Sequence, residues 1–252
     1  MGAEVEGGAA PLRPPARAFV GTSGWSYASW KPKFYPEGTR SADFLRYYAT
    51  RFSTLEVNYT FNHLPTEKNI AGWKEATTPD FLFALKASQQ ITHYRQLRDP
   101  AETLPLFFDR ARPLGERLGP ILFQTPPWLK RDDDRLAGFL ASLPRDVRSA
   151  LEVRDTSWYV DEVYELLRTV GVALVHAEGE RVPSPVGTLG ATAPFAYVRL
   201  RNRSGYTNDA IDRWAARLRA LVAAGTDVYA YFRHDEDGSN ALSAERLRGL
   251  LA

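Results

Sequence analysis

Polar side chains stand at the ends of several apolar runs, and two pairs of them have the spacing of one strand face. Asn58 follows Glu56 by two residues, and Arg154 follows Glu152 by two residues. Because side chains alternate along a strand, each pair points to one side of its sheet. Carboxylates can act as general acids or bases, and neighbouring cations tune them. We therefore expect Glu152 to be a general acid or base tuned by Arg154, with Lys86 and Arg154 stabilising negative charge.

Other polar residues at strand ends and in the following loops are expected to contact the substrate. Fixed cations suit a phosphate or carboxylate group. Asn58, Thr92, His93 and Gln124 would orient the substrate through amide, hydroxyl and imidazole groups. The full set of expected substrate contacts is Ser23, Trp25, Glu56, Asn58, Tyr59, Thr92, His93, Gln124, Trp158, Arg199, Arg201 and Arg233.

The same charges also have a purely structural interpretation. Glu56 with Lys86, and Glu152 with Arg154, could form buried salt bridges. Burying so many polar groups costs free energy unless they pair or meet a ligand. For each residue alone the two interpretations stay open, but for the set as a whole the sequence favours a ligand pocket.

Aromatic residues gather in the segments that follow the apolar runs. Such rings can stack on a base or a sugar, or they can pack the loops against one another. The residues concerned are Trp25, Tyr27, Trp30, Tyr59, Trp128 and Trp158.

Other kinds of site have weaker support. The chain has no cysteine, and its four histidines, at 63, 93, 176 and 234, lack the spacing of a zinc motif. We expect no metal and no other cofactor. Ser23 and His93 lack a third partner for a nucleophilic triad. Glu56 and Glu152 would suit a glycosidase only if their strands bring the two carboxyls within about 5–10 Å.

Eight short apolar runs must position these residues. They span 19–23, 54–58, 81–86, 120–124, 150–154, 172–176, 196–201 and 227–233. Helical patterns lie between them, for example at 104–118, 132–143, 161–170, 208–224 and 243–251, with Thr66 as a helix cap before another. Residues 178–194 are rich in Gly, Pro, Ser and Thr, so the sixth crossover is expected to be a loop.

Alternating strands and helices allow a closed (β/α)8 barrel or an open doubly wound sheet. The strand count favours the barrel, and no strand is followed by a G-x-G-x-x-G or phosphate-loop motif. In a barrel, the carboxyl ends of the strands form the active face. We expect a disordered tail over residues 1–17 and one barrel domain over residues 18–252.

Composition narrows the class of partner. The formal net charge is +2 and the isoelectric point is about 8.8, which is too mildly basic to indicate nucleic-acid binding by itself. No run approaches the length of a membrane span, and the N-terminus lacks the pattern of a signal peptide. We therefore expect a cytoplasmic protein with no membrane partner.

A series of short motifs follows one order along the chain. They are GTSGWSY at 21–27, LEVNYTF at 55–61, FALKA at 83–87, LGPILFQTPP at 118–127, LEVR at 151–154, AYVRL at 196–200 and DVYAYF at 227–232. In these motifs the chain resembles the YecE-like family, domain-of-unknown-function family 72. The resemblance implies a TIM-barrel fold and names no activity. The chain departs from the family pattern at Arg201-Asn202, where His-Gly is expected, and after Arg233, where an Asn-rich turn is expected.

Two functions follow from these observations as hypotheses. The first is a hydrolase or lyase that acts on a phosphorylated or nucleotide-like small molecule at a basic, aromatic-rich pocket. The second is a nucleic-acid-binding protein that holds a single strand or a flipped base without metal-dependent chemistry. The expected partner is thus a small anionic molecule or a nucleic acid.

Overall fold

The computed structural model describes residues 15–179, 184–185, 187 and 189–252. Most of the tail expected over residues 1–17 lies outside the described residues. At its end, the backbone N–H of Arg17 donates to Asp227, and the carbonyl of Arg17 accepts from Val228. In the described part of the chain, no helix combines the length and the apolar character that crossing a membrane requires.

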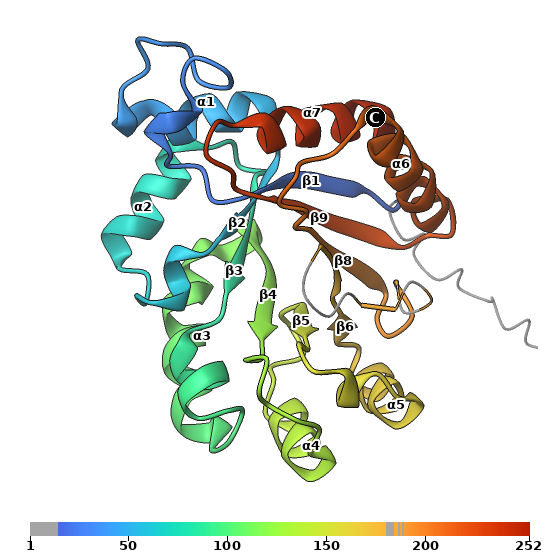
Figure 1. Cartoon of the computed structure of the whole chain (residues 1–252). Coiled ribbons are helices and arrows are strands. Elements are labelled where there is room, and N and C mark those ends of the chain that lie inside the picture. The colour runs from blue at the N-terminus through green and yellow to red at the C-terminus, as the bar shows by residue number, and fades with distance from the viewer. Residues whose placement is uncertain (1–14, 180–183, 186, 188) are drawn as a thin grey trace, which may run out of the picture.

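Nine parallel strands form one curved sheet (Figure 1). They coincide closely with the eight predicted runs. There are nine strands because the run at 172–176 corresponds to two short ones, β6 and β7. Each pairs in parallel with its neighbours, so all carboxyl ends meet at one face. The strands are β1 (Ala18–Ser23), β2 (Thr54–Val57), β3 (Leu82–Lys86), β4 (Leu118–Gln124), β5 (Ser149–Glu152), β6 (Ala173–Leu174), β7 (His176–Glu178), β8 (Phe195–Leu200) and β9 (Asp227–Arg233).

The barrel closes through one interrupted strand. The sheet order is β6-β5-β4-β3-β2-β1-β9-β8-β7, so its two ends are β6 and β7. Only Val175 separates these two segments, and its N–H continues the β5 pairing by donating to Leu151 at 2.9 Å. The sixth strand of the barrel therefore pairs with β5 through its first half and with β8 through its second half. The closed barrel confirms the predicted fold, and the open sheet is not found.

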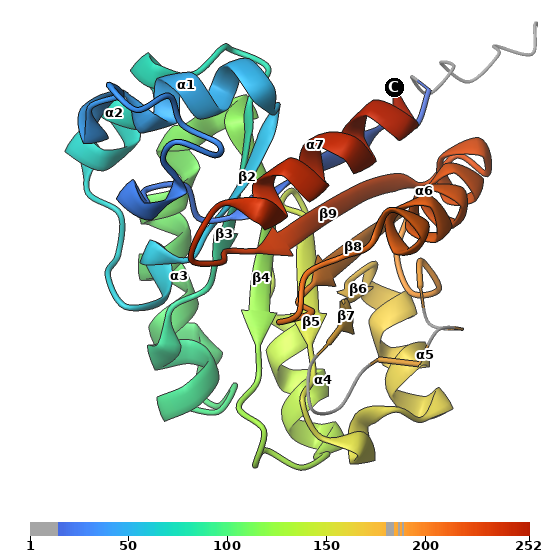
Figure 2. The ribbon, with the colours of Figure 1, turned by 45° about the horizontal axis from the view of Figure 1, so that its top comes forward.

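Helices surround the sheet on its outer side (Figure 1). The two C-terminal helices pack against each other and cover β1 and β9 (Figure 2). As predicted, the described residues between β7 and β8 contain no α-helix. The helices are α1 (Phe44–Arg51), α2 (Glu67–Ala76), α3 (Pro100–Ala111), α4 (Asp133–Ala141), α5 (Asp161–Val170), α6 (Asn208–Ala223) and α7 (Ser239–Leu251).

Local signals explain where two of these helices begin or end. Thr66 caps α2 with a reciprocal pair of bonds to Asn69, as the sequence predicts for the cap. The prediction for 104–118 is wrong at its end, because α3 stops at Ala111 and a 3-10 segment, Arg112–Arg117, follows. Pro113 offers no N–H, and Gly115 adopts a φ of +62°, so the α-helical pattern cannot continue.

The apolar core has two layers. The larger lies between the sheet and the helices, and the smaller fills the barrel with rings such as Phe19, Tyr197 and Tyr231. One hydroxyl joins the layers between β1 and β2: Tyr48 accepts from the backbone of Thr22 at 2.8 Å and donates to the carbonyl of Thr54 at 3.1 Å. It replaces backbone pairing that the two strands lack there, since they are in register only near their carboxyl ends.

Candidate functional site

A chain of buried ionic hydrogen bonds crosses the carboxyl end of the barrel. Arg199 on β8 donates through Nη1 to Glu152 Oε2 and through Nη2 to Glu56 Oε1, both at 2.7 Å. The hydroxyl of Tyr197 donates to the other oxygen of Glu56, and Gln124 Nε2 donates to the other oxygen of Glu152, both at 2.8 Å. All four carboxylate oxygens therefore have a donor, and one guanidinium links β2 and β5, which are not neighbours in the sheet.

Charge and burial together fix the ionisation of this network. Burial opposes the charged form of Glu152, but Arg199, Arg201 and Arg154 outweigh it and lower the pKa of the carboxyl to about 2. Burial likewise opposes the cation at Arg199, but the two glutamates raise the pKa of that guanidinium. The pKa of the Tyr197 phenol is raised well above its usual value, by burial and by Glu56. Glu152 is therefore an ionised carboxylate over the whole physiological pH range.

Lys86 lies at the end of β3, at the same carboxyl end of the barrel, which we call the mouth. The Lys86 ammonium is 3.9 Å from the centroid of the Phe61 ring and forms no ion pair with any described carboxylate. Burial lowers its pKa to about 8, and the nearby Arg199 contributes in the same direction. Among the described residues, this is an amine that titrates close to neutral pH beside buried charges.

His93 contacts the same aromatic ring, that of Phe61. Its ring meets the Phe61 ring edge to face with centroids 4.9 Å apart, and its Nδ1 is 2.9 Å from the hydroxyl of Thr92. Burial, Lys86 and Arg154 lower the pKa of His93 below its usual value. The imidazole is therefore neutral at physiological pH, and Lys86 and His93 lie against one ring.

The structure decides between the two salt bridges that the sequence left open. Arg154 Nε is 3.7 Å from Glu152 Oε1, so that pair exists, although Arg199 is the closer partner. The pair between Glu56 and Lys86 does not form, because Arg199 and Tyr197 hold the Glu56 oxygens. Arg201 is close enough to act electrostatically on both Glu152 and Lys86. Lys86, Arg154, Arg199 and Arg201 thus all lie near enough to the carboxyl end of the barrel to act on its buried charges.

The remaining predicted contacts divide between the mouth and the framework. The hydroxyl of Ser23 donates to the carbonyl of Phe232 within the barrel wall. Arg233 is half-buried at the end of β9, and its carbonyl accepts from Asn240. Trp158, an expected substrate contact, is fully buried and donates to the carbonyl of Leu129, so it packs in the core. Trp30, for which the sequence left ligand stacking and loop packing open, is fully buried as well.

A pocket of about 330 Å³ adjoins the mouth. The loops after β1 and β2 and one face of α2 form it, and Trp25, Asn58 and Tyr59 among the predicted contacts line it. Gly24, with a φ of +100°, makes its shape possible, since a Cβ there would lie 2.4 Å from the hydroxyl of Tyr27. Only glycine allows the loop to fold so closely over that ring.

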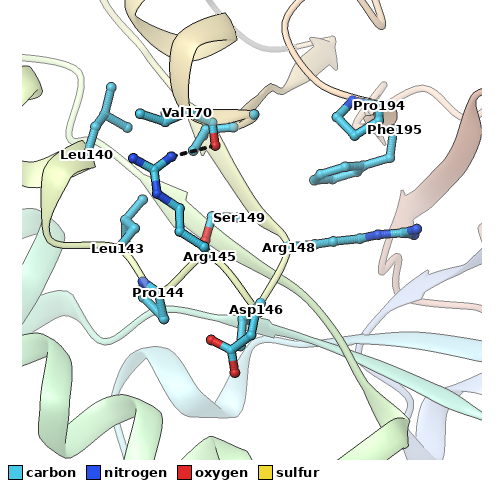
Figure 3. Close-up of a pocket in the computed structure, with 13 residues that line it drawn as sticks. Leu140, Leu143, Pro144, Arg145, Asp146, Arg148, Ser149, Val170, Pro194 and Phe195 are labelled. Carbon is cyan, nitrogen blue, oxygen red and sulfur yellow. Dashed lines mark hydrogen bonds between the residues drawn. The ribbon is translucent and has the colours of Figure 1, made fainter.

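A second cavity of about 400 Å³ lies at the opposite end of the barrel, before β5, β6 and β8 (Figure 3). Arg145 crosses it to donate to the carbonyl of Val170 at 3.0 Å. Arg148 points away from it and bonds to Tyr229 and Asp227. The amino ends of barrel strands stabilise the fold, whereas the carboxyl ends carry function. The candidate site is therefore the mouth and not this cavity.

The histidines are dispersed in the fold. His63 stacks on Tyr59, His234 stacks on Tyr27, and His176 meets Trp214 edge to face. Within residues 15–179 and the described positions beyond them, no three His, Asp or Glu side chains are placed to hold a metal ion.

Two members of the site were missed from the sequence. Tyr197 has the same two-residue spacing before Arg199 that drew attention to the other pairs, so strand periodicity could have found it. Phe61 lies in a 3-10 turn, Tyr59–Phe61, after β2, and no local pattern indicates that its ring would lie under Lys86.

Two curated proteins illustrate what this chain is similar to. The UPF0759 protein YunF of Bacillus subtilis (strain 168) is 22% identical over 272 residues, covering 92% of this chain and 94% of the relative. The UPF0759 protein YecE of Escherichia coli (strain K12) is 32% identical over 142 residues, covering 56% of this chain and 50% of the relative.

Solved structures include members of the same kind of family and more distant proteins that share the fold. A DUF72 family protein from Thermotoga maritima superimposes with a TM-score of 0.80 at 27% identity, covering 93% of this chain and 99% of the other. A sugar phosphate isomerase/epimerase from Parabacteroides distasonis has a TM-score of 0.55 at 11% identity, covering 97% and 98%, which shows a shared fold alone. Residues 19–252 match the family described as "Protein of unknown function DUF72", and the chain belongs to that family.

Proposed function

We propose that this protein is an enzyme, a hydrolase or lyase, that binds a phosphorylated or nucleotide-like small molecule at the mouth of its barrel. The observation that carries the proposal is Lys86: a largely buried amine with no carboxylate partner, beside the ionic network of Arg199. Burying a cation without an ion-pair partner costs free energy, and the attraction of Glu152 and Glu56 offsets that cost only in part, since the pKa of Lys86 is still lowered. An anionic ligand would supply the missing counter-charge.

The surrounding charge supports an anion in preference to a cation. Arg154 and Arg201 act on Glu152 together with Arg199, and both glutamates share that one guanidinium. A phosphate group at Lys86 would interact with its ammonium in a poorly solvated place, where each charge–charge interaction is strengthened. In this proposal Lys86 and Arg154 stabilise negative charge, which is the role that the sequence predicts for them.

The acid and base roles fall to other groups than the sequence suggested. Glu152, with both oxygens held and a pKa of about 2, is a poor proton acceptor near neutral pH. His93 is neutral and can accept a proton, while Lys86, with a pKa of about 8, can donate one. Groups whose environments separate their protonation states in this way are suited to acid–base catalysis. We assign the base to His93, the acid to Lys86, and a positioning role to Glu152.

The test begins with a panel of phosphomonoesters and nucleotides, followed by phosphorus NMR for turnover. Lys86→Met and His93→Gln should each lower kcat for the active compound by about a hundredfold or more. Lys68→Met, which removes an exposed lysine on α2, is the matched control and should leave kcat unchanged. Turnover that survives in both Lys86→Met and His93→Gln would refute the assignment.

A second candidate function rests on the exposed rings of the same face. Tyr59, Tyr94 and Trp128 lie on loops after β2, β3 and β4 and are 43%, 65% and 65% exposed. Exposed rings beside a basic mouth suit the stacked bases of a single strand. This function predicts binding of a labelled single-stranded oligonucleotide that weakens steeply with salt and is lost in Trp128→Ala, but not in Leu242→Ala on α7. Binding that is absent at low salt would remove it.

A further inference from the structure

The pocket beside the mouth has walls of aromatic rings and carries no charged side chain. Trp73 is buried at its base and meets Trp25 edge to face, with centroids 6.3 Å apart. The ring of Tyr27 stacks on His234 and that of Tyr59 stacks on His63, each with centroids 4.9 Å apart. Rings that already pack on a neighbour lose little freedom when a ligand binds, so the pocket suits a flat, neutral group.

Two amides in this pocket have unused hydrogen-bonding capacity. Asn69 Oδ1 accepts from the backbone and hydroxyl of Thr66, which fixes the amide and leaves its N–H pair without a partner among the described residues. Asn58 Oδ1 is buried and has no partner among the described residues. A buried amide oxygen without a donor costs free energy, so a bound group that offers a donor would be stabilised there.

The pocket and the mouth share a wall. Gly24 at the pocket's edge donates its N–H to the carbonyl of Glu56 at 2.9 Å, and Glu56 acts electrostatically on the Tyr27 hydroxyl. In addition, Tyr59 of the pocket and Phe61 of the mouth belong to one short turn, and the Phe61 ring contacts the Lys86 ammonium. The pocket and the mouth are therefore built on the same two loops, the ones that follow β1 and β2.

We propose that this pocket binds the nucleobase of a nucleotide whose phosphate lies at Lys86, with adenine as the base that its amides fit. This inference rests on the proposed function and names its substrate class. A nucleobase stacks on aromatic faces and offers donors and acceptors along one edge. Adenine presents an amino donor beside a ring-nitrogen acceptor, which is the pattern that asparagine side chains pair with.

Calorimetry with three probes tests the inference. AMP carries both groups, ribose 5-phosphate lacks the base, and adenosine lacks the phosphate. In the native protein, AMP should bind at least tenfold more tightly than ribose 5-phosphate. Tyr59→Ala should weaken AMP by about tenfold through lost stacking and leave ribose 5-phosphate unchanged. Leu106→Ala, an exposed apolar side chain on α3 outside the pocket, is the control and should alter neither.

A second variant addresses the amide. Because Asn58 Oδ1 lacks a described partner, Asn58→Ala should lower AMP affinity without lowering the unfolding temperature. Equal affinity of the native protein for AMP and ribose 5-phosphate would overturn the nucleobase pocket and leave the anion site standing. Binding of adenosine without any effect of a phosphate would support the pocket and overturn the anion site. If none of the three probes binds, both proposals fail.

Discussion

Arg199 and Glu152 form a fully buried ion pair, 2.7 Å between Nη1 and Oε2, at the centre of the barrel mouth. Through its other terminal nitrogen, Nη2, the same guanidinium binds Glu56. An ion pair in such a place contributes less to stability than its Coulomb energy suggests, because both charges lose their water. The pair fixes two carboxylates in the floor of the site, and Lys86 forms no ion pair with them.

Removing the shared cation should be strongly destabilising. Arg199→Met leaves two buried carboxylates without compensation, and we expect a loss of about 3–5 kcal/mol in the free energy of unfolding measured with urea. Arg248→Met, on an exposed part of α7, is the matched control and should change it by less than about 0.5 kcal/mol. A loss below about 1 kcal/mol in Arg199→Met would mean that the ionic network contributes little to the free energy of unfolding.

The decrease in the free energy of unfolding at acid pH should depend on the protonation of Glu152. Its pKa falls on folding from an ordinary 4.5 to about 2, so its stabilisation is complete above about pH 4.5 and is lost as the pH falls through about 2. The free-energy difference between native protein and Glu152→Gln should be about 3 kcal/mol at pH 6 and should shrink between pH 4.5 and 2. Glu75→Gln, exposed on α2, should show no such trend. A difference that stays constant with pH would contradict the depressed pKa.

Lys86 should make the protein less stable than it could be. The folded state lowers its pKa from 10.5 to about 8, so the charged amine is disfavoured by folding below pH 8. Lys86→Met should therefore be more stable than the native protein at pH 7, by up to about 3 kcal/mol. As the pH rises from about 8 to 10.5, the native protein regains this stability and the difference should disappear. Urea unfolding at pH 7 and pH 10.5 measures it, and an unstable Lys86→Met variant at pH 7 would contradict the prediction.

The hydroxyl between β1 and β2 should matter for the barrel wall. Tyr48→Phe leaves the buried backbone N–H of Thr22 and the carbonyl of Thr54 without their partner, which should cost about 1–3 kcal/mol of unfolding free energy. Tyr94→Phe removes a hydroxyl from an exposed ring and should cost almost nothing. Thermal unfolding of the two variants compares them directly, and equal unfolding temperatures would show that water replaces the Tyr48 hydroxyl.

Much of the architecture is encoded locally. The alternation of short apolar runs with helical patterns predicts the strands, their order and the face on which Glu56, Lys86 and Glu152 gather, because strand periodicity and strand ends depend on neighbours in sequence. The cap at Thr66 and the helix-free crossover after β7 are equally local. Helix ends are less secure, as the early stop of α3 before Pro113 shows.

Only the tertiary structure decides which charges meet. From the sequence, Glu56 could pair with Lys86 on the next strand and Glu152 with Arg154 two residues away, and of these two pairs only the second forms. Closure of the barrel instead brings Arg199 between the two glutamates, because a residue's partners across the interior depend on the stagger of all the strands together. The burial of Trp158 and the Phe61 ring under Lys86 have the same origin. The residue types that could do chemistry are therefore written in the sequence, whereas their partners, and with them their pKa values, are set by the closed fold.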